Sequence, residues 1–184
     1  MKSVQLIFLI ISCHFSFSAF AQNWLDGAEQ KWDNNPKEWT IYTDSLEGEL
    51  NFRWQLSNGT EAWDYIIGDD ISGNIEQTWG NDRTEWTLRA TNGEIITMKT
   101  VWQNDLTEWR ITDNTESFKL QQKWNNDKNE WYIDDKEWGE MLLETNYHND
   151  FRDWKVTDDL KDGLNIHFRM AIMFVVLTNT ISGF

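Results

Sequence analysis

The stretch Trp79-Gly80-Asn81-Asp82-Arg83-Thr84-Glu85-Trp86 decides the fold of this chain, because its pattern recurs along the sequence. The pattern is an aromatic residue, a polar turn sequence and a Trp seven positions after the first aromatic. Further copies run from Trp32 to Trp39, Trp54 to Trp63 (two residues longer), Trp102 to Trp109, Trp124 to Trp131 and Tyr147 to Trp154. Successive copies start 22–25 residues apart, which is the signature of a repeat protein.

Each copy is predicted to form a β-hairpin. Apolar residues alternate with polar ones on both sides of the aromatic pair, as at Ile96 and Met98 before Trp102. Alternation with period two is typical of strands that have one apolar face. Between the two aromatics, Asn and Asp are turn formers. If residues 81–84 form a four-residue loop, Trp79 lies opposite Trp86, so the two indoles of each repeat are expected to touch.

Six hairpins in sequence predict an all-β fold, an antiparallel meander of about 12 strands. Open twisted sheets rarely exceed about ten strands without curling or splitting. The sequence therefore favours a curled sheet or a closed up-and-down barrel with the Trp face inward. A hairpin solenoid or an open single-layer sheet is the alternative architecture.

The two ends of the chain differ from the repeats. Residues 1–21 resemble a secretory signal peptide, with Lys2, an apolar run and a small-residue cleavage site at Ala19-Phe20-Ala21, so we expect an exported protein. A lipoprotein signal ending at Cys13 is the alternative. Residues 22–170 form the expected repeat domain. Residues 171–184 are an apolar tail, interpreted either as a closing strand or as a seventh repeat interrupted by a shift of reading frame.

Composition excludes several functions. The chain has 184 residues, with 16 basic and 31 acidic side chains, and this negative charge argues against nucleic acid as a partner. No cysteine follows the leader, so disulfides and zinc–thiolate sites are not expected. No apolar run in the mature chain is long enough for a transmembrane helix.

Catalysis and metal binding also lack a pattern. The acidic residues belong to the repeats, and neither His148 nor His167 accompanies a serine or a set of metal ligands. The Asn-Asp-x-x-Glu turns contain calcium-type oxygen ligands, but too few in each turn for a dedicated cation loop. We therefore expect no enzyme, no cofactor and no metal.

The order of residues resembles the choline-binding and glucan-binding repeats of bacterial cell-wall-attached proteins. Those repeats also place two Trp seven apart, followed by Gly-x-apolar-x-Thr, an order matched here by Trp79, Trp86, Gly93, Ile95 and Thr97. The resemblance covers about residues 32–170. It departs in its longer period and in the missing tyrosines after the second Trp, so it implies envelope or glycan recognition without choline binding.

These observations predict a secreted, non-enzymatic protein that binds a glycan or a cell-envelope component through its Trp-rich face. Amides that share this face with the indoles would make it suitable for a polar ligand. The candidate ligand-binding residues are Trp79, Trp86, Trp102, Trp109, Trp124, Trp131, Gln77 and Gln122. The alternative is a structural or adhesive repeat protein without a small-molecule ligand, in which the tryptophans form the core.

Overall fold

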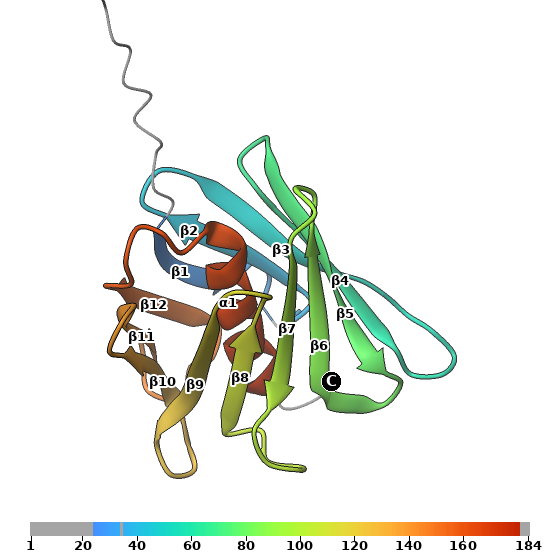
Figure 1. Ribbon diagram of the computed structural model, residues 1–184. Coiled ribbons are helices and arrows are strands. Elements are labelled where there is room, and N and C mark those ends of the chain that lie inside the picture. The colour runs from blue at the N-terminus through green and yellow to red at the C-terminus, as the bar shows by residue number, and fades with distance from the viewer. Residues whose placement is uncertain (1–23, 34, 181–184) are drawn as a thin grey trace, which may run out of the picture.

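The computed structural model describes residues 24–33 and 35–180 as twelve strands and one helix (Figure 1). The predicted signal peptide, including Cys13, lies outside the described residues. The strands are β1 (Leu25–Gln30), β2 (Glu38–Thr43), β3 (Glu47–Gln55), β4 (Glu61–Ile67), β5 (Ile71–Trp79), β6 (Asp82–Ala90), β7 (Ile95–Thr100), β8 (Glu108–Thr112), β9 (Ser117–Trp124), β10 (Asp127–Asp135), β11 (Gly139–Thr145) and β12 (Asp153–Asp158).

The strands form a closed up-and-down barrel. Each strand pairs antiparallel with the next, and β1 pairs with β12 through Ala28 opposite Trp154, which closes the sheet. Closure leaves no sheet edge unpaired. The structure thus confirms the predicted antiparallel meander and selects the barrel over the solenoid and the open sheet.

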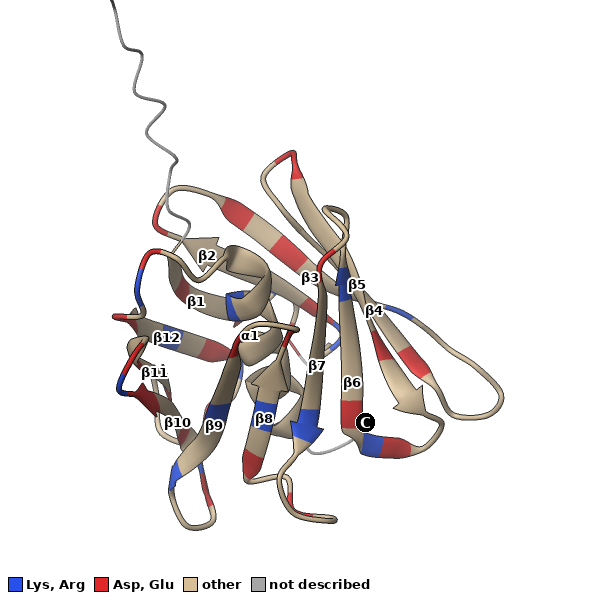
Figure 2. Ribbon diagram, in the orientation of Figure 1, with Lys and Arg blue, Asp and Glu red and all other residues tan. Residues whose placement is uncertain are grey.

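Alternation along each strand separates an apolar interior from a polar exterior. On β9, for example, Phe118 and Leu120 are buried, whereas Lys119 between them is exposed. Figure 2 shows acidic and basic residues distributed over the strands of the barrel wall. Because neighbouring side chains on a strand point to opposite faces, the barrel can be apolar inside while the outer wall carries the charge.

The C-terminal segment is a helix inside the barrel, α1 (Ile166–Thr180) (Figure 1). The closing strand expected from its apolar sequence is therefore wrong. The sequence lacks a helical period because nearly every side chain of α1 is buried, and a helix surrounded by apolar groups needs no polar face. Phe174 packs edge-on against Trp63 and Trp86, at ring-centroid distances of 5.8 and 4.9 Å. None of the helices in the described residues reaches the length and apolarity of a membrane span.

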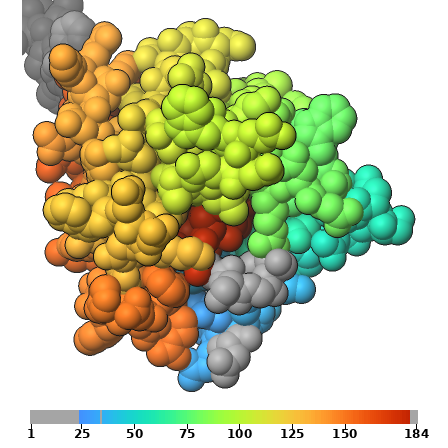
Figure 3. All heavy atoms as spheres, turned by 90° about the horizontal axis from the view of Figure 1, so that it is seen from below, coloured from blue at the N-terminus to red at the C-terminus, as the bar shows by residue number. Residues whose placement is uncertain are grey.

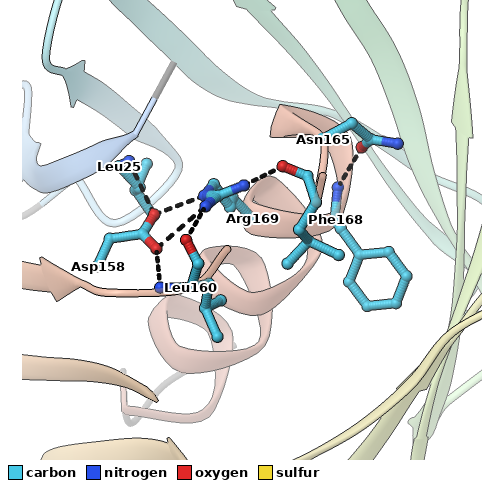
Figure 4. Close-up of polar contacts among 7 residues, drawn as sticks. Leu25, Asp158, Leu160, Asn165, Phe168 and Arg169 are labelled. Atoms are coloured by element: carbon cyan, nitrogen blue, oxygen red, sulfur yellow. Dashed lines mark hydrogen bonds and ion pairs between the residues drawn. The ribbon is translucent and has the colours of Figure 1, made fainter. Parts of the chain in front are cut away.

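Polar contacts hold the N-terminal end of α1 (Figure 4). Asn165 caps the helix by accepting a hydrogen bond from the Phe168 amide at 3.1 Å. The buried guanidinium of Arg169 donates to Asp158 at 2.5 Å and to the carbonyl of Leu160 at 3.2 Å. A buried ion pair needs such additional hydrogen bonds to offset its desolvation.

Candidate binding rim

The hairpin turns determine where each aromatic side chain points. In the third hairpin Gln77 lies opposite Trp86, and Trp79 lies opposite Asp82, with an irregularity in register between them. The turn has two residues, and Asn81 adopts the left-handed conformation with φ 59°. The predicted pairing of Trp79 with Trp86 is therefore wrong. The shorter turn and the irregularity between Gln77 and Trp79 break the regular alternation, so that Trp86 is buried (2% exposed) while Trp79 is 63% exposed.

The second Trp of every repeat belongs to the core. Trp86, Trp109 and Trp131 are 2%, 0% and 0% exposed. Each donates its indole N–H to the backbone carbonyl three residues earlier in its own hairpin, and for Trp109 the acceptor is Leu106, at 2.9 Å. The buried indole is thus satisfied and fastens the loop to the core. These three tryptophans were predicted to contact a ligand, and the structure places all three in the core rather than at the surface.

The first aromatic of most repeats is exposed. Because hairpin turns alternate between the two ends of a meander, these residues all lie at one end of the barrel. We call the exposed set the aromatic rim, and it consists of Trp32 (58% exposed), Trp79 (63%), Trp102 (61%), Trp124 (58%) and Tyr147 (70%). Figure 3 views the barrel from below, where side chains of the wall surround a hollow in which atoms of α1 are visible. Of the predicted ligand-binding tryptophans, Trp79, Trp102 and Trp124 therefore remain accessible.

Carboxylates accompany the rim indoles. The indole N–H of Trp102 donates to Glu108 at 3.3 Å, and that of Trp124 donates to Glu130 at the same distance. Trp32 makes the equivalent bond to Glu38 at 3.1 Å. Glu130 also pairs with a lysine, Lys123, at 2.8 Å. The repeating unit of the rim is thus an exposed ring with hydrogen-bonding groups at its edge.

The predicted amides occupy the inner side of the wall. Gln77 is 5% exposed, and its Oε1 accepts a hydrogen bond from the backbone N–H of Glu61, at 2.9 Å, in the preceding hairpin. Gln122 lies opposite the buried Trp131 and is half-buried. Gln77 and Gln122 each lie two residues before an exposed rim indole on the same strand, but they are buried and half-buried, so the structure does not unite the eight predicted residues in one face.

Polar pockets lie between neighbouring hairpins at the rim end. One, of about 320 Å³, lies between the second and third hairpins and is lined by Gln55, Gly59, Glu61, Gln77, Asn81 and Arg83. A second, of about 200 Å³, lies between the sixth and first hairpins and includes the exposed Tyr147. Most of these lining residues were not predicted from the sequence. The one feature that could have indicated the first pocket was the longer second repeat.

Aspartates at the turns serve the hairpins themselves. Asp82 accepts hydrogen bonds from the backbone N–H and the hydroxyl of Thr84, and these bonds lower the pKa of the Asp82 carboxyl. The equivalent bonds from Thr107 lower the pKa of Asp105. Among the described residues no group of three or more His, Cys, Asp or Glu is arranged to hold a metal ion. The turn carboxylates act here as turn formers.

Comparison with known proteins adds no relative: no family model, no curated protein and no solved structure matches the chain.

Proposed function

We propose that this protein is an exported, non-enzymatic binding module whose aromatic rim binds a glycan of the cell envelope. The observation that carries the proposal is the placement of five large aromatic side chains, 58–70% exposed, at equivalent positions around one end of a rigid barrel. Exposed aromatic side chains gathered on one surface are typical of interaction sites. The proposed glycan ligand explains why exposed aromatic residues recur at this position of the repeat.

The chemistry of each rim unit fits a sugar. A pyranose ring has an apolar C–H face that can pack on an indole and hydroxyls around its edge that need hydrogen-bond partners. At Trp102, Glu108 supplies such an acceptor at the edge of the indole. Aromatic side chains with a polar handle suit ligands that are apolar on one face and wet on the other. The same unit recurs at Trp32 and Trp124.

Repetition around the barrel favours a polymeric ligand. Several weak sites on one rigid body bind a repeating chain more tightly than any one of them, because the later contacts are intramolecular. We therefore expect weak binding of short oligosaccharides and stronger binding of polysaccharides.

A structural or adhesive role is the second candidate. It is favoured by the filled interior of the barrel, where α1 packs against the second Trp of the repeats and these indoles form part of the core. In this role the rim would contact other surfaces without recognising a sugar.

Affinity electrophoresis separates the two candidates. Native gels containing hydroxyethyl cellulose, glycol chitin or laminarin should retard the wild type, and Trp102→Ala combined with Trp124→Ala should restore most of its mobility. The control is Ile95→Ala, which removes an exposed apolar side chain (47%) at the start of β7, at the opposite end of the barrel, and should be retarded like the wild type. Equal retardation of the rim variant and the wild type would refute rim binding. Unretarded wild type in all three gels would favour the structural role.

A further inference from the structure

The pocket between the second and third hairpins differs from the rest of the rim in containing a buried carboxylate. The side chain of Glu61 is 9% exposed. Its Oε1 accepts from Gln55 Nε2 and from Arg83 Nη2, both at 3.3 Å. A carboxylate loses favourable hydration when it is buried, so its position needs strong compensating partners. Two hydrogen bonds of this length to the same oxygen are modest compensation.

Glu61 departs from the repeat. The residue two positions before the second Trp is Lys37, Thr84, Thr107, Asn129 or Arg152 in the other five hairpins. Thr84 and Thr107 donate to the turn aspartates at this position, a task that Glu61 does not share. The acid that other repeats carry next to the second Trp is replaced by Ala62. Since adjacent strand residues face opposite sides, this change moves the carboxylate from the outer wall into the pocket.

Gln77 adds a donor to the same pocket. Because its Oε1 accepts the Glu61 backbone N–H, its Nε2 is the end of the amide that remains for another acceptor. Across the described part of the chain, neither Gln77 Nε2 nor Glu61 Oε2 has a hydrogen bond to protein. Both side chains line the pocket. The pocket thus presents one acceptor and one donor, each on a side chain at least nine-tenths buried.

We propose that this pocket binds one neutral pyranose unit of the glycan that the rim holds, an inference that rests on the proposed function. A sugar hydroxyl both donates and accepts, so vicinal hydroxyls can bond to Glu61 Oε2 and Gln77 Nε2 together. The ion pair of Glu61 with Arg83 makes the pocket close to neutral, which disfavours a phosphate and a cation alike. Its volume of about 320 Å³ lies at the lower end of the range for ligand pockets, ~300–1,000 Å³, and suits one ring.

The pocket adjoins the rim. Asn81 lines it and follows the exposed Trp79 by two residues, across the turn that Gly80 makes against the backbone of Asn58. A Cβ at Gly80 would lie 2.0 Å from the Asn58 carbonyl oxygen, so this close approach of the two hairpins requires glycine. A polymer with one unit in the pocket can therefore continue over the Trp79 indole.

Competition by monosaccharides tests the pocket. Methyl β-glucopyranoside and N-acetylglucosamine, added to the polysaccharide gels, should reduce retardation of the wild type. Glu61→Gln should weaken polymer binding about tenfold or more and remove this competition, since a hydrogen bond to a charged group is lost. The matched control, Glu76→Gln, changes a carboxylate on β5 that bonds to Asn74, outside the pocket lining, and should behave like the wild type.

Two further measurements test the pocket even if Glu61→Gln does not fold. Gln55→Ala changes an exposed side chain of the pocket and should lower the effect of both monosaccharides about threefold without altering the urea midpoint. Side-chain amide resonances of Gln77 and Asn81 in the wild type should shift on addition of methyl β-glucopyranoside. Glu61→Gln retarded like the wild type, with unshifted amide resonances, would overturn the pocket while rim binding stands. Wild type that no polysaccharide retards would overturn both proposals.

Discussion

The two aromatics of one repeat should differ sharply in their effect on stability. Trp109 is 0% exposed and Trp102 is 61% exposed, although they belong to the same hairpin. A buried aromatic removes ~150–250 Å² from water, which at ~25 cal/mol per Å² is at most about 4–6 kcal/mol. We therefore expect Trp109→Ala to lower the free energy of unfolding by about 3–5 kcal/mol, as is usual for such core truncations.

Trp102→Ala should cost much less. About two-fifths of the Trp102 surface is covered in the folded protein. At the same energy per unit area, burial of this side chain contributes at most roughly 1.5–2.5 kcal/mol to the free energy of unfolding. The unfolded chain also covers part of this surface, so we expect about 1 kcal/mol or less. The difference between the two variants should therefore exceed about 2 kcal/mol.

Urea unfolding followed by far-ultraviolet circular dichroism measures both variants independently of the indole that each one loses. The slope with urea should stay the same and the midpoint should move, which is the mark of a change in stability alone. If Trp109→Ala does not fold, Trp109→Phe can replace it, because it removes less of the buried side chain. Equal losses for Trp102→Ala and Trp109→Ala would refute the reasoning, because the first aromatic would then belong to the core and the rim would not be an accessible surface.

Three further predictions concern the helix and the turns. Burial lowers the pKa of His167, so below about pH 6.5 the unfolded chain binds a proton that the folded protein does not. The free energy of unfolding should therefore fall by up to ~1.4 kcal/mol per pH unit as the pH is lowered. Between pH 7 and 5 the urea midpoint should change less with pH for His167→Gln than for the wild type. Asp158→Ala leaves the Arg169 guanidinium buried without its carboxylate and should cost about 3–5 kcal/mol, and adding Arg169→Leu should recover part of this loss in thermal unfolding. Asn126 has φ 62°, so Asn126→Val should lower the free energy of urea unfolding by roughly 1–2 kcal/mol, whereas Asn126→Gly should not.

The local features of the repeat were predictable because they depend on neighbouring residues. Alternation before Trp102 predicted a strand with one buried face, and the structure buries Met98 and exposes Lys99 accordingly. The regular period predicted a meander, and the width of the sheet predicted that it would curl. Which of the two tryptophans would be buried was not predictable from spacing, since regular alternation places both on one face and only the register irregularity between Gln77 and Trp79 breaks that alternation.

By itself, the sequence determined that six hairpins follow one another with one apolar face each, since turn chemistry and alternation act over a few residues. Only the tertiary structure decided what fills the barrel and what meets at its rim. The apolar tail becomes a helix because the closed wall surrounds it and removes the need for a polar face. Glu61 and Gln77 share a pocket because β4 pairs with β5, a contact between hairpins that neither hairpin specifies alone.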